Sequence, residues 1–164
     1  MFFRSRPLIT IQIEKPNNFD VMDYSGWYFT ISPHRSLIDE YSCFNNGEPL
    51  IKISTFDKSN YQYAMSQQSA NDISEETFKD KSYTVTIPPN NTFNRLKYYT
   101  VKGKYNLLEI LYFPGACLYK DKNYDEELHS ILGSLQFTEI ATGNKGTLDD
   151  VSIINWKKPP IQIN

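Results

Sequence analysis

Alternating hydrophobic and polar positions recur along the chain and predict a sheet. The clearest case is residues 83–87, where Tyr83, Val85 and Ile87 alternate with two threonines, and Pro88-Pro89 ends the run. A two-residue period is typical of a strand that is buried on one face. Strands with a similar period are predicted at residues 8–14, 27–31 and 50–56.

Residues 96–102 and 104–113 form two apolar-rich runs that meet at Gly103, and they predict a hairpin. The second run places hydrophobic side chains on both faces, with Glu109 as its only charge. A strand with this composition is expected to be covered on both sides.

Two helices are predicted. Ser74, followed by two glutamates, has the features of a helix start and predicts a short helix over residues 74–81. Asn123, with Glu126 three residues later, predicts a second start, and apolar residues then recur at helical spacing to Leu135. Residues 135–140 are predicted to continue as a final strand. The polar stretch at 57–70 is expected to be a long loop.

These elements predict an α+β domain over residues 1–140, a mostly antiparallel twisted sheet flanked by helices. Residues 141–164 differ in composition and are expected to form a C-terminal extension. Val151, Ile153, Ile154 and Trp156 are too apolar for a free tail, so part of the extension is expected to dock.

The order of elements resembles the Mog1/PsbP-like superfamily. The resemblance depends on Gly26-Trp27 and on the segment 124–137, which reads YDEELHSILGSLQF. It implies an α/β/α sandwich that works by binding other proteins. No site residue of that superfamily can be matched to a position in this chain.

Composition narrows the class of protein. The chain has 164 residues, a net charge of −2 and 15% aromatic residues, which are values of a folded domain and not of a disordered chain. No apolar stretch reaches the length of a membrane span, so no membrane span is expected. The chain as given is expected to be cytoplasmic, with a periplasmic location as the alternative if a signal or lipoprotein anchor was removed.

The two cysteines, Cys43 and Cys117, are far apart in the sequence and form no CxxC motif. Two buried free thiols are the favoured interpretation, and one disulfide is the alternative.

No motif predicts catalysis, a metal site or a cofactor. The segment 121–125 has the alternating oxygen ligands of a calcium loop, but Glu126 and Leu132 occupy the positions that require Gly and Glu. His34 and His129, the two histidines, are isolated from any zinc-ligand pattern. An enzyme with an unfamiliar site would require one of them to meet carboxylates in a cleft.

Four basic residues flank a pair of tyrosines on the predicted hairpin, a mixture found in single-stranded nucleic-acid sites. They are Arg95, Lys97, Lys102 and Lys104. The acidic pI of about 5.7 favours an ordinary solvated hairpin, so no nucleic-acid partner is expected.

A non-catalytic protein-binding domain is the leading functional hypothesis. Within it we favour a bacterial accessory protein, such as an immunity protein that blocks a toxin or a chaperone of a secreted effector. Four aromatic residues in segments without an obvious core role are the candidate contacts. They are Tyr41, Tyr61, Tyr63 and Trp156. The alternative is a carrier that encloses a lipid or small molecule between sheet and helix.

Overall fold

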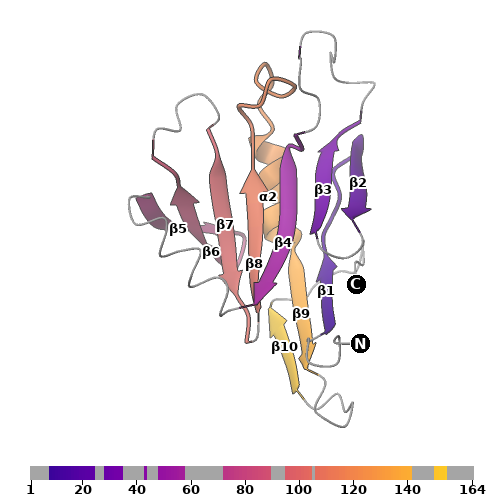
Figure 1. Ribbon diagram of the computed structural model, residues 1–164, viewed down its shortest axis with the longest axis vertical. Helices are drawn as coiled ribbons and strands as arrows, with labels where there is room; N and C mark the ends of the chain where they lie inside the picture. The colour runs from indigo at the N-terminus through magenta and orange to yellow at the C-terminus, as the bar shows by residue number, and fades with distance from the viewer. Residues whose placement is uncertain are drawn as a thin grey trace.

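Two antiparallel sheets and one helix make up the described part of the chain (Figure 1). The computed structural model describes residues 8–24, 28–34, 43, 48–57, 72–89, 95–104, 106–141 and 150–154. The strands are β1 (Leu8–Gln12), β2 (Phe19–Tyr24), β3 (Tyr28–Pro33), β4 (Ile51–Asp57), β5 (Asp72–Phe78), β6 (Lys81–Ile87), β7 (Lys97–Lys102), β8 (Asn106–Tyr112), β9 (Gln136–Ala141) and β10 (Asp150–Ile154), and the helix is α2 (Asp125–Ser134).

The larger sheet has seven strands in the order β2-β3-β4-β8-β7-β6-β5, and every neighbouring pair is antiparallel. The prediction of a mostly antiparallel sheet is therefore confirmed, and so is the hairpin at Gly103, whose N–H donates to the carbonyl of Asn106 at 2.8 Å. The prediction of flanking helices is wrong for the described residues. Only α2 packs on this sheet, behind it in Figure 1, so these residues form no α/β/α sandwich.

The prediction of a helix at residues 74–81 is also wrong, because most of these residues belong to two strands. β5 pairs with β6 along seven residues, from Asp72↔Ile87 to Phe78↔Lys81. Lys79 adopts a positive φ of 57° in the two-residue turn between them. Local capping signals at Ser74 are weak compared with the hydrogen bonds of a full hairpin, so tertiary pairing decides the conformation.

The smaller sheet has the order β1-β9-β10. β9 follows α2 directly, pairs with β1 on one side and with β10 on the other, and so joins residues near both ends of the described chain. Ile11 and Phe137 from this sheet lie in the same hydrophobic cluster as Ile53, Ile110 and the inner face of α2. The two sheets and the helix therefore share one core.

Helix α2 turns Leu128, Ile131 and Leu132 towards the sheet, where each is at most 1% exposed. Strand residues on the same side include Tyr83 and Ile110, which are also buried. Burial of side chains of this size stabilises the fold by roughly 1.5–3 kcal/mol each. The helix is thus held mainly by its apolar stripe.

Side chains also satisfy the carbonyl groups at the end of α2, which have no partner within the helix. Lys81 Nζ donates to the carbonyl of Gly133 at 2.8 Å, and Tyr83 Oη donates to that of Leu132 at 2.5 Å. Ser134 Oγ donates to the carbonyl of Ile131 and accepts the N–H of Glu14. The last turn of α2 contains no basic residue, so the buried ammonium of Lys81 supplies the positive charge that this end of a helix dipole favours.

Replacement of Tyr83 by Phe tests this anchor. The variant leaves the carbonyl of Leu132 without its donor in a buried position, so we expect the free energy of unfolding to fall by about 1–2 kcal/mol. Urea denaturation followed by circular dichroism measures the change. Tyr98→Phe is the matched control, because the Tyr98 hydroxyl makes no hydrogen bond within the described residues. An equal fall in the free energy of unfolding in both variants would show that the hydrogen bond from Tyr83 to Leu132 does not stabilise the fold.

Candidate functional site

The four aromatic residues predicted as contacts lie outside the described residues. Tyr41, Tyr61, Tyr63 and Trp156 therefore stay predictions. Within the described residues, two other surfaces have features of a binding site: the outer face of the seven-stranded sheet and a charged groove beside α2.

The outer face is the set of side chains that point away from α2. Because successive strand residues point to opposite faces, Tyr83 on the helix side places Thr84 and Thr86 on the outer side. Strand register then extends this face across all seven strands. One row of paired positions runs Met22, Thr30, Lys52, Leu111, Tyr98, Thr86, Ile73.

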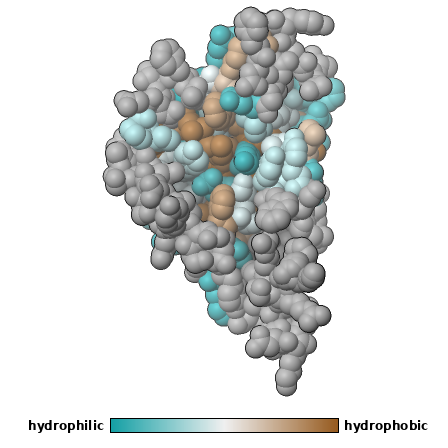
Figure 2. Space-filling view, in the orientation of Figure 1, coloured by the Kyte–Doolittle hydropathy of each residue, from teal (hydrophilic) through white to brown (hydrophobic). Residues whose placement is uncertain are grey.

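Exposed hydrophobic side chains concentrate on the outer face. Met22 and Ile73, at opposite edges of the sheet, are 57% and 59% exposed, and Tyr24 and Phe56 are each 39% exposed. These four are all the large hydrophobic side chains that are exposed within the described residues. Figure 2, which looks onto this face, shows hydrophobic residues at the middle of the described surface with hydrophilic residues around them.

Aromatic stacking fixes one end of the outer face. The rings of Tyr24 and Tyr28 stack with their centroids 4.6 Å apart, and Lys52 Nζ lies 4.4 Å from the centroid of Tyr28. The Tyr24 hydroxyl donates to the sulfur of Met22 at 3.8 Å. These contacts hold large side chains in place at the surface, which lowers the entropy that a partner must remove on binding.

Glu109 is the acid at the centre of this face, on β8. Burial raises the pKa of its carboxyl, and nearby Lys52 acts in the opposite direction. Burial, and then Glu109, raise the pKa of the neighbouring Tyr98. The Thr86 hydroxyl is buried without a hydrogen-bond partner among the described residues. The centre of the outer face is thus a poorly solvated environment.

The charged groove lies on the helix side and has a volume of about 440 Å³. Tyr99 of β7 and Tyr112 of β8 belong to its lining from the sheet, and α2 contributes residues such as Leu128. The connection between β8 and α2, which we name the 113–124 loop, forms a further wall. Most of the lining is charged: Glu76, Arg95, Lys97, Lys120, Asp121, Lys122 and Asp125.

Burial and the charges of the groove act on the pKa values of its two tyrosines. Burial, followed by Glu76 and Asp125, raises the pKa of Tyr99. Burial and the hydrogen bond to Asp125 raise the pKa of Tyr112, with Arg95 acting in the opposite direction. The strand register places Glu76 opposite Tyr83, and Arg95 donates to the carbonyl of Pro114, which follows Tyr112 by two residues.

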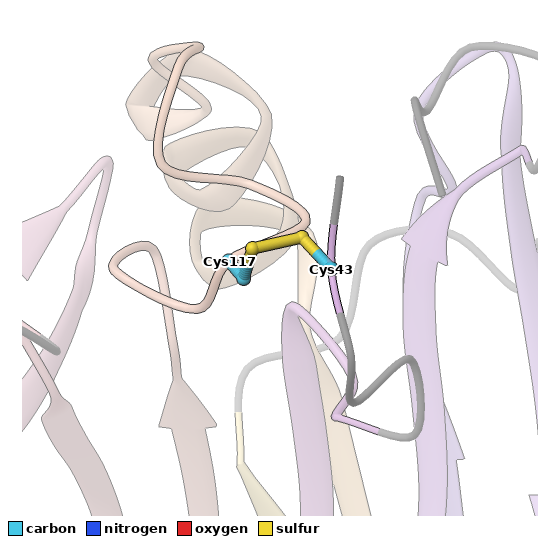
Figure 3. Close-up of a disulfide and its surroundings, with 2 residues drawn as sticks. All are labelled: Cys43 and Cys117. Atoms are coloured by element: carbon cyan, nitrogen blue, oxygen red, sulfur yellow. A yellow bond between two sulfur atoms is a disulfide. The ribbon is translucent and has the colours of Figure 1, made fainter. Parts of the chain in front are cut away.

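Several contacts hold the 113–124 loop. A disulfide joins Cys117 to Cys43, which precedes β4 (Figure 3). The favoured interpretation of two free thiols is therefore wrong, because the fold brings together two positions that are 74 residues apart in the sequence. Tyr119 Oη donates to the carbonyl of Glu48 at 2.8 Å. Arg95 donates to the carbonyl of Pro114 at 3.3 Å.

The start of α2 differs slightly from the prediction. The helix begins at Asp125, and Asn123 Oδ1 accepts the N–H of Asp125 at 2.9 Å. Asp125 Oδ1 accepts the Tyr112 hydroxyl at 3.0 Å. Two side chains of the segment that resembles a calcium loop, Asn123 and Asp125, thus make hydrogen bonds at the N-terminal end of α2. Within the described residues, no group of three His, Cys, Asp or Glu side chains has the arrangement of a metal site.

The two histidines lie in different places. His34 Nε2 is 4.0 Å from Asp20 Oδ2, and both side chains are more than half exposed. His129 lines the charged groove, and its ring lies against Phe78 with the centroids 4.9 Å apart. The His34–Asp20 distance exceeds that of a hydrogen bond.

The basic residues of the hairpin do not form one surface with its tyrosines. Tyr99 faces the helix side and is 1% exposed, whereas Tyr98 faces the outer side. A strand alternates its faces, so Lys97 and Lys102 also point to opposite sides. The stacking platform that single-stranded nucleic acid uses is absent from these residues.

Comparisons with protein-family models, with curated protein sequences and with solved structures find no match for this chain. The resemblance to the Mog1/PsbP-like superfamily therefore stays a prediction. The two surfaces must be interpreted from their own chemistry. No helix in the described ranges is long and apolar enough to cross a membrane.

Glu109→Gln tests the poorly solvated centre of the outer face. The raised pKa means that the folded state keeps a proton that the unfolded state has lost, so the stability of the wild type falls as pH rises through this window. We expect the glutamine variant to be more stable than the wild type at neutral pH. The difference in the free energy of unfolding between the two proteins should shrink at pH values below the ordinary pKa of a carboxyl group. Chemical denaturation at several pH values measures it.

Glu75→Gln provides the control, since Glu75 is exposed on the same face. Its effect should stay within about 0.5 kcal/mol at every pH. A glutamine variant of Glu109 that is less stable than the wild type at neutral pH would contradict the interpretation.

Removal of the disulfide should destabilise the chain. We expect the double variant Cys43→Ser, Cys117→Ser to lose about 2–4 kcal/mol of unfolding free energy, because the disulfide restricts a long loop of the unfolded chain. Denaturation with and without reductant measures the loss. Reductant should lower the stability of the wild type and leave the variant unchanged. An unchanged wild type would show that the disulfide does not form.

Proposed function

We propose that this protein is a non-catalytic protein-binding domain and that the outer face of the seven-stranded sheet is its contact surface. The observation that carries the proposal is that Met22, Tyr24, Phe56 and Ile73, which are all exposed, lie on one face of the sheet. Exposed hydrophobic side chains gathered on one face are typical of interaction sites, and tyrosine and methionine are enriched in interfaces.

The side chains of the outer face favour a partner that presents both apolar and charged side chains. The hydrophobic side chains stand at the two edges and on β4, while smaller residues such as Thr30, Ser54 and Thr100 between them are buried. Because these smaller residues are already buried, a partner that presents apolar side chains would contact the four exposed ones. The adjacent Lys52 and Glu109 provide charges of both signs, which favours selectivity over indiscriminate association.

Within this class we favour an accessory protein, such as an immunity protein that blocks a toxin or a chaperone of a secreted effector. The Cys43–Cys117 disulfide favours action in a non-reducing compartment, such as the periplasm, over the cytoplasm expected from the sequence. Binding by a preformed sheet face would block the partner by covering its surface.

The carrier hypothesis has less support. Fully buried side chains, including Ile53, Ile110 and Leu132, fill the space between the sheet and α2. The groove beside them is lined mainly by charged residues, whereas lipid sites are lined mainly by apolar ones.

The experiment is partner capture with matched variants. Tagged wild type and the double variant Met22→Glu, Ile73→Glu are compared in an extract of the native cell, and a retained protein is then purified for affinity measurement. Both residues are mostly exposed, so folding should be preserved. We expect one stoichiometric partner for the wild type and at least about tenfold weaker binding for the variant.

Asn17→Glu and Ser74→Glu serve as controls, since both positions are exposed and Ser74 is the neighbour of Ile73 on the other side of β5. They should bind like the wild type. Equal binding by the outer-face variant would place the contact elsewhere. Reproducible absence of any partner would overturn the proposed function.

A further inference from the structure

We propose that the charged groove binds a small polyvalent oxyanion, a molecule that carries two or more carboxylate or phosphate groups. The side chains that would bind it are Arg95, Lys97, Lys120 and Lys122, all of which line the groove. This surface is distinct from the outer face, because Tyr99 and Tyr112 on the helix side of the sheet form part of its lining.

Among the described residues, the four basic side chains have no anionic partner. None of them forms an ion pair within 4 Å in the described part of the chain. Arg95 makes one hydrogen bond, to the backbone carbonyl of Pro114, and this leaves most of its donors available. Cations that line a cavity without partners raise the local concentration of anions.

The acids of the groove do not cancel this charge. One carboxylate oxygen of Asp125 already has a partner, because Oδ1 accepts the Tyr112 hydroxyl. Glu76 pairs with Tyr83 on β6, whereas Lys97 pairs with Tyr112 on β8, so the register places the two on different rows of the sheet. Asp121 remains beside Lys120 and Lys122. Over the whole lining, three carboxylates therefore stand against four cations, an excess of one positive charge.

The cations come from two separate elements, which favours a ligand with more than one charged group. Arg95 and Lys97 lie at the start of β7, whereas Lys120 and Lys122 belong to the 113–124 loop. A molecule with two oxyanion groups would contact both elements at once. The volume of about 440 Å³ lies within the range of small-molecule sites.

The loop that carries two of the cations is fixed before any ligand arrives. The Cys43–Cys117 disulfide, the Tyr119 hydroxyl and the Arg95 side chain tie it to neighbouring segments. A fixed wall lowers the conformational entropy lost on binding. The groove is therefore preorganised on its basic side.

Titration of the full-length, oxidised chain with tripolyphosphate and with citrate tests the proposal. Amide shifts in two-dimensional NMR should saturate and should concentrate in residues 95–99 and 112–129. Lys120→Gln combined with Lys122→Gln should weaken binding about tenfold. Added sodium chloride should weaken it further, because ion contacts are screened.

Lys15→Gln combined with Lys102→Gln is the matched control, since both lysines are exposed and lie outside the groove. It should bind like the wild type. Equal weakening in both double variants, or shifts spread over all surface lysines, would show nonspecific association and overturn the proposal. Absence of saturation at millimolar concentrations of both probes would also overturn it. Met22→Glu, Ile73→Glu should bind the probes normally, which separates this site from the proposed protein contact.

Discussion

The attachment of α2 to one face of the seven-stranded sheet is the contact on which the rest of the structure depends. Hydrophobic burial places the helix there, but burial alone leaves its position along the strands poorly defined. The hydrogen bonds from Lys81 and Tyr83 to consecutive carbonyls, Leu132 and Gly133, fix that position. With its C-terminal end anchored on β6, the helix directs its N-terminal end towards β8, where Tyr112 binds Asp125. The groove is the space that remains beside this second contact.

The same attachment explains why the outer face has its exposed hydrophobic residues. A helix on one side of a sheet buries the alternate residues of each strand that face it. On the outer face Thr86 and Leu107 are buried as well, whereas Met22 and Ile73 stay exposed. On β8 the buried set includes Leu108 and Ile110, and the outer set includes Glu109 and Leu111. A carboxyl with a raised pKa at this position is a cost for the isolated chain.

Much of the fold could be predicted from local patterns, and the exceptions have identifiable causes. β6, the β7–β8 hairpin and α2 have strong periodicity, and each appears close to its predicted range. β5 was predicted as a helix because Ser74 and its glutamates have a capping pattern, whereas a seven-residue pairing with β6 determines its conformation. β2 was missed because it is an edge strand in which only Phe19 is buried. The disulfide and the groove depend on contacts between distant segments, for which no single stretch of sequence contains a signal.

The two proposed sites depend on adjacent residues of one strand. On β7, Lys97 and Tyr99 face the groove, and Tyr98 between them faces outward, next to Leu111. Because neighbouring side chains point to opposite faces, one strand supplies both surfaces with no residue in common. The sheet between them is a rigid layer of paired strands, so occupation of the groove has no evident route to deform the outer face. The two surfaces are therefore expected to act independently, and binding at one should leave the affinity of the other unchanged.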